Sequence, residues 1–103
     1  MAKKRPTKEQ RDMMDKMVRY GCVACHTDNI YSEAEINHIR NHTGLGLRDH
    51  DKILPLCPKH HRYGKISIHL GKKAFVEKYG TEEQLAKQVR ERIEEWNEIA
   101  DIF

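Results

Sequence analysis

The sequence predicts a small α+β domain that needs a bound metal ion to complete its core, with one helix flanking that core on each side. Three observations support this prediction. First, the chain has 103 residues, of which 38% are hydrophobic and 34% are charged, so that a hydrophobic core alone would be marginal. Second, its three cysteines occur in short cysteine and histidine pairs. Third, two short apolar segments lie between segments of helical periodicity.

Composition favours a protein of a reducing compartment. Lys and Arg outnumber Asp and Glu by 19 to 16, a mildly basic balance that permits nucleic-acid binding without requiring it. The cysteine count is odd, no signal peptide is recognisable, and no apolar run approaches the roughly 20 residues of a membrane span. We therefore expect a cytoplasmic protein with no membrane partner, whose clustered Cys and His bind metal instead of forming disulfides.

The chain is expected to begin with a flexible basic arm over residues 1–7, followed by a single domain over 8–103. Thr7 and Gln10 have the spacing of a capping box, which predicts a helix over 8–19. Apolar residues recur on one face of this helix and should join the core: Met13, Met14, Met17 and Val18.

Two short strands are expected in the middle of the chain. Alternating apolar and polar residues in "YSEAEINHIR" predict a strand over 34–39. The segment "KILPLC", residues 52–57, predicts a second strand or extended segment, in which Pro55 excludes a central position in a sheet. The Gly, Asn and Asp residues between these segments predict a loop.

Three further helices are expected after the second strand. Pro58 can open a short helix over 58–63, and "GKKAFVEKYG" predicts another that its final glycine ends. A second capping box, Thr81 with Gln84, starts a last helix over about 82–100, with the apolar stripe Leu85, Val89, Ile93 and Trp96. Three apolar residues lie beyond this stripe: Ile99, Ile102 and Phe103. They could contact a second copy of the chain, so the sequence is compatible with a monomer or a homodimer.

Cys22-x-x-Cys25 and Cys57-x-x-His60 are two pairs whose spacing lets both side chains reach one ion. Zn²⁺ prefers four such ligands in a tetrahedron, and Cys₃His is a standard structural set. We therefore predict a structural zinc site, and unfolding when the metal is removed. The alternative is a redox dithiol at the first pair, with Cys57 as a buried apolar residue. It is disfavoured because a redox pair normally follows a strand, whereas this pair follows a helix.

The remaining histidines suggest a second site. His61 follows the zinc ligand His60 directly, and Asn37 and His38 lie on the first predicted strand. A bent strand end can place one of these two on a metal ion and the other beside it. This arrangement suits phosphodiester hydrolysis, in which a neutral His removes a proton from water while a divalent ion holds the phosphate.

The order of these motifs, Cys-x-x-Cys, Asn-His-Ile and Leu-Cys-x-x-His-His, resembles that of the HNH endonucleases, also called ββα-metal or His-Me finger nucleases. In more detail, "INHIR", "TGLGLRDHDKILPLCPKHH", "SIH" and "KKAFVEKYGT" are similar to the nuclease domain of the phage recombination-enhancement nucleases of the Ref group. This similarity covers roughly residues 20–85. It implies a ββα-metal core and a DNA endonuclease whose products carry a 5′-phosphate.

The resemblance also implies roles for the matching residues. His38 would be the general base, and Asn37 the metal ligand or orienting residue beside it. His61 would bind a single catalytic Mg²⁺ or Mn²⁺, with His69 a second histidine near the same ion. The structural zinc would be held by Cys22, Cys25, Cys57 and His60.

Two positions depart from the HNH pattern. Position 37 is Asn where most members have Asp or His, and an amide oxygen is a weaker ligand for a hard cation. The middle Asn of the pattern, which steers the base, has no direct equivalent, and Asp49 or Asp51 is the candidate for its role.

The positions of the other basic residues and histidines relative to these motifs indicate which of them could contact DNA. Those nearest the proposed ion are the best candidates for contact with DNA phosphates: Arg40, Arg62 and Lys65. Three histidines match no ligand spacing and are expected to have no function: His26, His42 and His50.

The sequence thus predicts a metal-dependent DNA endonuclease from a phage or prophage, connected with recombination and acting in the cytoplasm of a bacterial host. Its candidate partners are DNA and a recombinase filament. Two alternatives remain open. One is a catalytically silent zinc-knuckle module that binds nucleic acid, and the other is a zinc-stabilised adaptor whose last helix binds a protein.

Overall fold

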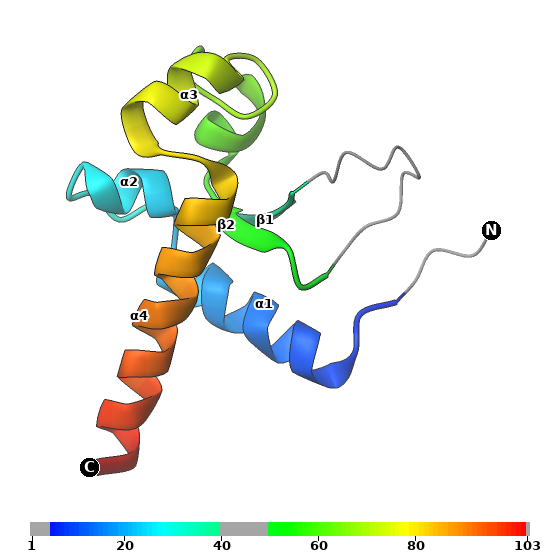
Figure 1. The fold of residues 1–103 in the computed structure, drawn as a ribbon, viewed down its shortest axis with the longest axis vertical. Coiled ribbons are helices and arrows are strands. Elements are labelled where there is room, and N and C mark those ends of the chain that lie inside the picture. Colours follow the sequence, from blue (N-terminus) through cyan, green and yellow to red (C-terminus); the bar gives the residue numbers. More distant parts are fainter. Residues whose placement is uncertain (1–4, 40–49, 103) are drawn as a thin grey trace.

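A computed structural model describes residues 5–39 and 50–102, with side chains described as far as Trp96. The protein is a small α+β domain, as predicted (Figure 1). Its elements are, in order, α1 (Lys8–Tyr20), α2 (Val23–Thr27), β1 (Glu35–His38), β2 (Ile53–Leu56), the π-helical turn η1 (Lys59–Tyr63), α3 (Lys72–Tyr79) and α4 (Glu82–Ile102).

The two strands form an antiparallel pair at the centre of the molecule (Figure 1). In this pair Ile36 lies opposite Pro55 and His38 lies opposite Ile53. Pro55 is tolerated because, within residues 5–39 and 50–102, β2 has a single strand neighbour, so one side of its backbone needs no ladder hydrogen bond. All four residues of β2 are buried, since α1, α2 and α4 pack around this strand.

Helix α1 begins as predicted, with both hydrogen bonds of the Thr7–Gln10 capping box present. Met17 is fully buried, and Met13 and Met14 pack against the core. Val18 was expected on the same face, but 42% of its surface is exposed. The apolar stripe of this helix is therefore narrower than the sequence pattern indicated.

Helix α4 is the longest element and crosses the sheet and α1 (Figure 1). Its capping box is formed by Thr81 and Gln84, and its stripe is buried at Leu85, Val89 and Ile93. Trp96 breaks the expected pattern, because 54% of its surface is exposed although its ring lies 5.5 Å from that of Tyr20. At this point the helix extends beyond the core.

Two connecting segments differ in detail from their predictions. The first cysteine pair was expected in a tight turn and instead starts the short helix α2, where the Cys22 sulfur accepts a hydrogen bond from the Cys25 N–H at 3.5 Å. The segment expected as a helix over 58–63 is the π-turn η1, closed by a hydrogen bond from the Gly64 N–H to the Lys59 carbonyl at 2.8 Å. Only glycine fits at position 64, because an added Cβ would collide with this carbonyl.

Some predictions fall outside the described residues. These are most of the basic arm, the glycine-containing loop over 41–49, the residues Arg40, His42 and Asp49, and the side chains of Ile99, Ile102 and Phe103.

Candidate metal centre and reaction pocket

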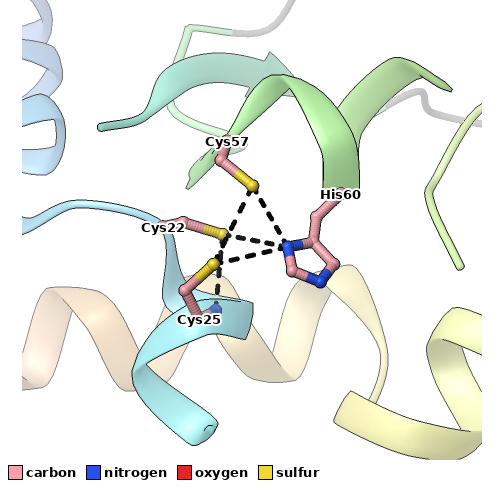
Figure 2. A group of neighbouring side chains, drawn as sticks. All are labelled: Cys22, Cys25, Cys57 and His60. Carbon is pink, nitrogen blue, oxygen red and sulfur yellow. Dashed lines mark hydrogen bonds between the residues drawn. The ribbon is translucent and has the colours of Figure 1, made fainter. Parts of the chain in front are cut away.

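The four predicted zinc ligands meet in one cluster (Figure 2). Nδ1 of His60 lies 3.6 Å from the sulfur of Cys22, 3.5 Å from that of Cys25 and 3.1 Å from that of Cys57. The sulfurs of Cys25 and Cys57 are 3.9 Å apart, and all four ligand atoms lie within 4.8 Å of one another. The start of α2 therefore meets the end of β2 and η1 at this point.

These distances fit a tetrahedral zinc ion. Zn–S bonds of about 2.3 Å place two sulfur ligands about 3.8 Å apart, close to the separation of Cys25 and Cys57. Burial raises the pKa of the Cys22 thiol to about 12, and burial, helped by the charge of Lys59, lowers the pKa of His60. Zinc must therefore displace thiol protons when it binds, which makes its affinity depend on pH.

A second layer of hydrogen bonds orients His60. The Tyr79 hydroxyl donates to Oδ2 of Asp28 at 2.8 Å, and its oxygen lies 3.2 Å from Nε2 of His60. Burial, reinforced by the Asp28 carboxylate, raises the pKa of Tyr79, so the phenol stays protonated. The Nε2–H of His60 can then donate to Tyr79 while Nδ1 faces the sulfurs, an outer-shell arrangement typical of metal-bound histidines.

A separate pocket of about 290 Å³ lies at the end of β1. Among the described residues, its lining contains three of the residues singled out for catalysis, together with three others: Asn37, His38, His69, Ile68, Lys72 and Glu82. The end of β1 therefore brings Asn37 and His38 to the same pocket although they are neighbours on a strand.

Glu82 fixes the amide of Asn37. Asn37 is 3% exposed, and its Nδ2 donates to Oε2 of Glu82 at 2.8 Å. The other carboxylate oxygen of Glu82 lies 3.2 Å from Nζ of Lys72. This hydrogen bond fixes the orientation of the Asn37 amide, whose oxygen and second N–H are not used by it.

The ring of His61 lies beside that of His69 and is hydrogen-bonded to the carboxylate of Glu35. Its Nδ1 is 2.6 Å from Oε1 of Glu35, and Arg62 donates to the same carboxylate from Nε at 2.7 Å. Burial raises the pKa of the Glu35 carboxyl, but the hydrogen bonds from Arg62 and His61 outweigh it and lower this pKa. A carboxylate on one ring nitrogen of a histidine leaves the other nitrogen for a metal ion.

The backbone places the two histidines together. The segment after η1 folds back, so that the His69 N–H donates to the His61 carbonyl at 3.1 Å and the Ile68 N–H to the His60 carbonyl at 3.0 Å. The rings of His61 and His69 then lie edge to face, with centroids 4.8 Å apart.

His38 contacts His50, which sequence reasoning left without a role. Nε2 of His38 lies 3.0 Å from Nδ1 of His50, and the rings meet edge to face. Asp51, one candidate for steering the base, accepts a hydrogen bond from Nε2 of Gln10 at 3.1 Å.

The predicted phosphate-contacting residues are separated. Arg62 lies against Glu35, whereas Lys65 lines a larger depression of about 710 Å³ beside the zinc cluster. In the described part of the chain, Lys72 is the lysine that lines the pocket of His38.

Within the described ranges, no second set of three His, Cys, Asp or Glu ligand atoms gathers as tightly as the zinc cluster. Mg²⁺ does not require such a cage, because it usually keeps several waters and takes few protein ligands. The described donors around His61 and His69 do not form a closed structural site.

Besides His50 and Lys72, four residues of these sites were missed in the sequence: Glu35, Glu82, Tyr79 and Asp28. Glu35 alone had a usable signal, since alternation on a strand places it on the same face as Asn37.

A family model described as recombination enhancement, RecA-dependent nuclease matches residues 6–94. The chain therefore belongs to this family of RecA-dependent nucleases. The similarity to the Ref group is thereby confirmed, and membership implies an involvement with DNA and RecA. Within the part of the chain that the structure describes, no helix is long and apolar enough to cross a membrane.

Proposed function

We propose that the chain is a metal-dependent DNA endonuclease of the HNH type, in which His38 is the general base. The observation that carries this proposal is the pocket shared by Asn37, His38 and His69, with the ring of His61 against His69. Membership of a nuclease family supports it independently.

In the proposed reaction, His38 accepts a proton from a water molecule, and the water oxygen attacks the phosphorus. The bond from phosphorus to the 3′ oxygen breaks, and the phosphate stays on the 5′ end. The base must be neutral to act. Its place on the pocket wall, half-buried at the end of β1, lets it reach a phosphate bound there.

The residues proposed to hold the catalytic Mg²⁺ or Mn²⁺ are His61, the amide oxygen of Asn37, and His69. Such an ion would neutralise charge that develops on the phosphate and the departing oxygen. Glu35 supports His61 in this role, since its carboxylate fixes the ring through Nδ1. Glu82 supports Asn37 in the same way.

Positive side chains would position the DNA backbone. Lys72 is best placed, since it lines the pocket and 60% of its side chain is exposed. Arg62, 55% exposed, lies on the Glu35 side of the same region, and Arg40 and Lys65 are candidates from their sequence positions. Because these side chains would contact phosphates and not bases, we expect DNA binding with weak sequence preference and strong salt dependence.

Phage or prophage recombination in the bacterial cytoplasm is the proposed setting, with the single domain 8–103 as the nuclease and the arm 1–7 as a flexible extension. RecA, assembled on DNA, is the proposed partner, because the family is named for its dependence on RecA.

The test is cleavage of circular plasmid and of RecA-coated DNA with Mg²⁺ or Mn²⁺. The wild type should cleave at least one substrate, and His38→Ala should reduce the rate by about 100-fold or more. Lys87→Ala, an exposed basic change on α4, is the control and should cleave normally. Equal cleavage by wild type and His38→Ala would contradict the proposal. DNA binding without cleavage under every condition would favour the zinc-knuckle alternative.

A further inference from the structure

We propose that His50 is a positioning residue for His38, which fixes the orientation and the tautomer of the base by accepting a hydrogen bond from its Nε2–H. This inference rests on the proposed function for the role of His38. Its geometric basis is independent of that role, because it comes from the contact between the two rings.

The fold brings the two histidines together where β1 ends and β2 begins. His38 is the last residue of β1 and lies opposite Ile53. Beyond this pair the Ile39 N–H donates to the Lys52 carbonyl at 2.8 Å, which extends the ladder by one step. The turn containing His50 is therefore tied directly to the end of β1.

His50 is well placed to act as a rigid support. Only 7% of its surface is exposed, so its ring is held in the protein interior. Its ring meets that of His38 at 74°, with centroids 5.1 Å apart, and its Nδ1 points at Nε2 of His38 at 3.0 Å. This distance is that of a good N–H···N hydrogen bond.

The contact constrains where the protons lie. A hydrogen bond between two imidazole nitrogens needs one proton, so one nitrogen donates and the other accepts. A neutral His38 that donates from Nε2 carries its lone pair on Nδ1, and Nδ1 is then the atom that takes the proton from water. His50 must in turn keep Nδ1 unprotonated and carry its own proton on Nε2.

This assignment gives His50 the task that the sequence suggested for Asp49 or Asp51. Asp49 lies outside the described residues, and the Asp51 carboxylate accepts a hydrogen bond from Gln10. A histidine acceptor differs from a carboxylate in being uncharged, so it orients the base without adding negative charge next to the scissile phosphate.

The first experiment compares two substitutions at the same position. His50→Asn keeps an acceptor near the place of Nδ1, whereas His50→Leu fills the space without one. We expect His50→Leu to lower kcat by about 100-fold with KM changed less than about threefold, and His50→Asn to recover most of that loss. Zinc content and thermal unfolding of both variants must match the wild type. Equal activity of His50→Leu and wild type, or equal losses in the two folded variants, would overturn the inference.

The second experiment reads the tautomer of the wild-type protein directly and does not depend on activity or on the folding of a variant. Nitrogen-15 NMR of the imidazole rings at neutral pH should show His38 protonated at Nε2 and unprotonated at Nδ1. The opposite tautomer would overturn the inference. If no DNA substrate is cleaved, the proposed function fails, and this spectrum still decides whether His50 fixes the ring of His38.

Discussion

Asn37 and Glu82 form a buried hydrogen bond between the end of the sheet and the first turn of the last helix, with Nδ2 donating to Oε2 at 2.8 Å. Both residues are nearly inaccessible, at 3% and 4% exposure. Helix α4 therefore fixes the orientation of the Asn37 amide in the wall of the pocket.

Glu82→Ala should lower the free energy of unfolding by roughly 1–3 kcal/mol, because it leaves the amide of Asn37 buried without its acceptor. Glu83→Ala is the matched control, since Glu83 is exposed in the same first turn and shares the favourable interaction with the helix dipole. Urea unfolding at saturating zinc measures both. Equal losses in the two variants would show that the hydrogen bond contributes nothing beyond the helix dipole.

His60→Ala and His61→Ala should differ in bound zinc although the residues are neighbours. Nδ1 of His60 faces the three sulfurs, whereas Nδ1 of His61 faces Glu35. We expect one zinc per chain in the wild type and in His61→Ala, and substoichiometric zinc with loss of structure in His60→Ala. Elemental analysis with circular dichroism checks this, and a strong chelator should unfold the wild type. A folded His61→Ala variant that lacks zinc would contradict the assignment of His60, and not His61, as the zinc ligand.

Tyr79→Phe should weaken zinc binding by about 10- to 100-fold while leaving the stoichiometry unchanged, because it removes the hydroxyl that orients His60. Competition with a chromophoric chelator measures the affinity. Tyr63→Phe is the control, since Tyr63 is 65% exposed and lines the same depression. If Tyr79→Phe binds zinc as tightly as this control, the Tyr79 hydroxyl does not support the site.

Glu35 should make part of the stability depend on acid pH. Its pKa in the folded protein is lowered below the unfolded value of about 4.3. The unfolded chain therefore binds more protons as pH falls, so the contribution of Glu35 is complete above about pH 4.3 and is lost as pH falls through the lowered folded pKa.

The comparison is between Glu35→Gln and Glu33→Gln, an exposed change nearby. Glu35→Gln should be less stable than Glu33→Gln at pH 7, and this gap should shrink below about pH 4. Both variants are unfolded at the same saturating zinc concentration, so that the difference between them isolates Glu35 over the pH range in which zinc stays bound. A gap that stays constant with pH would refute the assignment.

The features that the sequence reveals are local ones. A capping box needs residues three apart, and the zinc pairs likewise have their ligands within one turn, so spacing alone identifies them. The joining of the two zinc pairs could be predicted because Zn²⁺ requires four ligands. The strands and the boundaries at Gly64 and Gly80 also follow from local signals.

The partners of the site residues could not be predicted in the same way. Glu82 lies on a different element from Asn37, and Tyr79 lies on a different element from His60. No spacing rule connects such pairs, because they meet only after the helices pack on the sheet. Trp96 shows a different limit. It continues the apolar periodicity of α4 and was predicted to be buried, but it is exposed because the helix extends past the end of the core.

The π-turn η1 constrains how this segment can vary among natural sequences. His60 on one side serves the zinc cluster, and His61 on the other lies against Glu35. A substitution within the turn alters one side, but inserting or deleting a residue between Cys57 and His60 would turn both histidines relative to Cys57 and disturb both contacts. Related sequences should therefore vary at positions such as Lys59 and Tyr63 while the length of this segment stays the same.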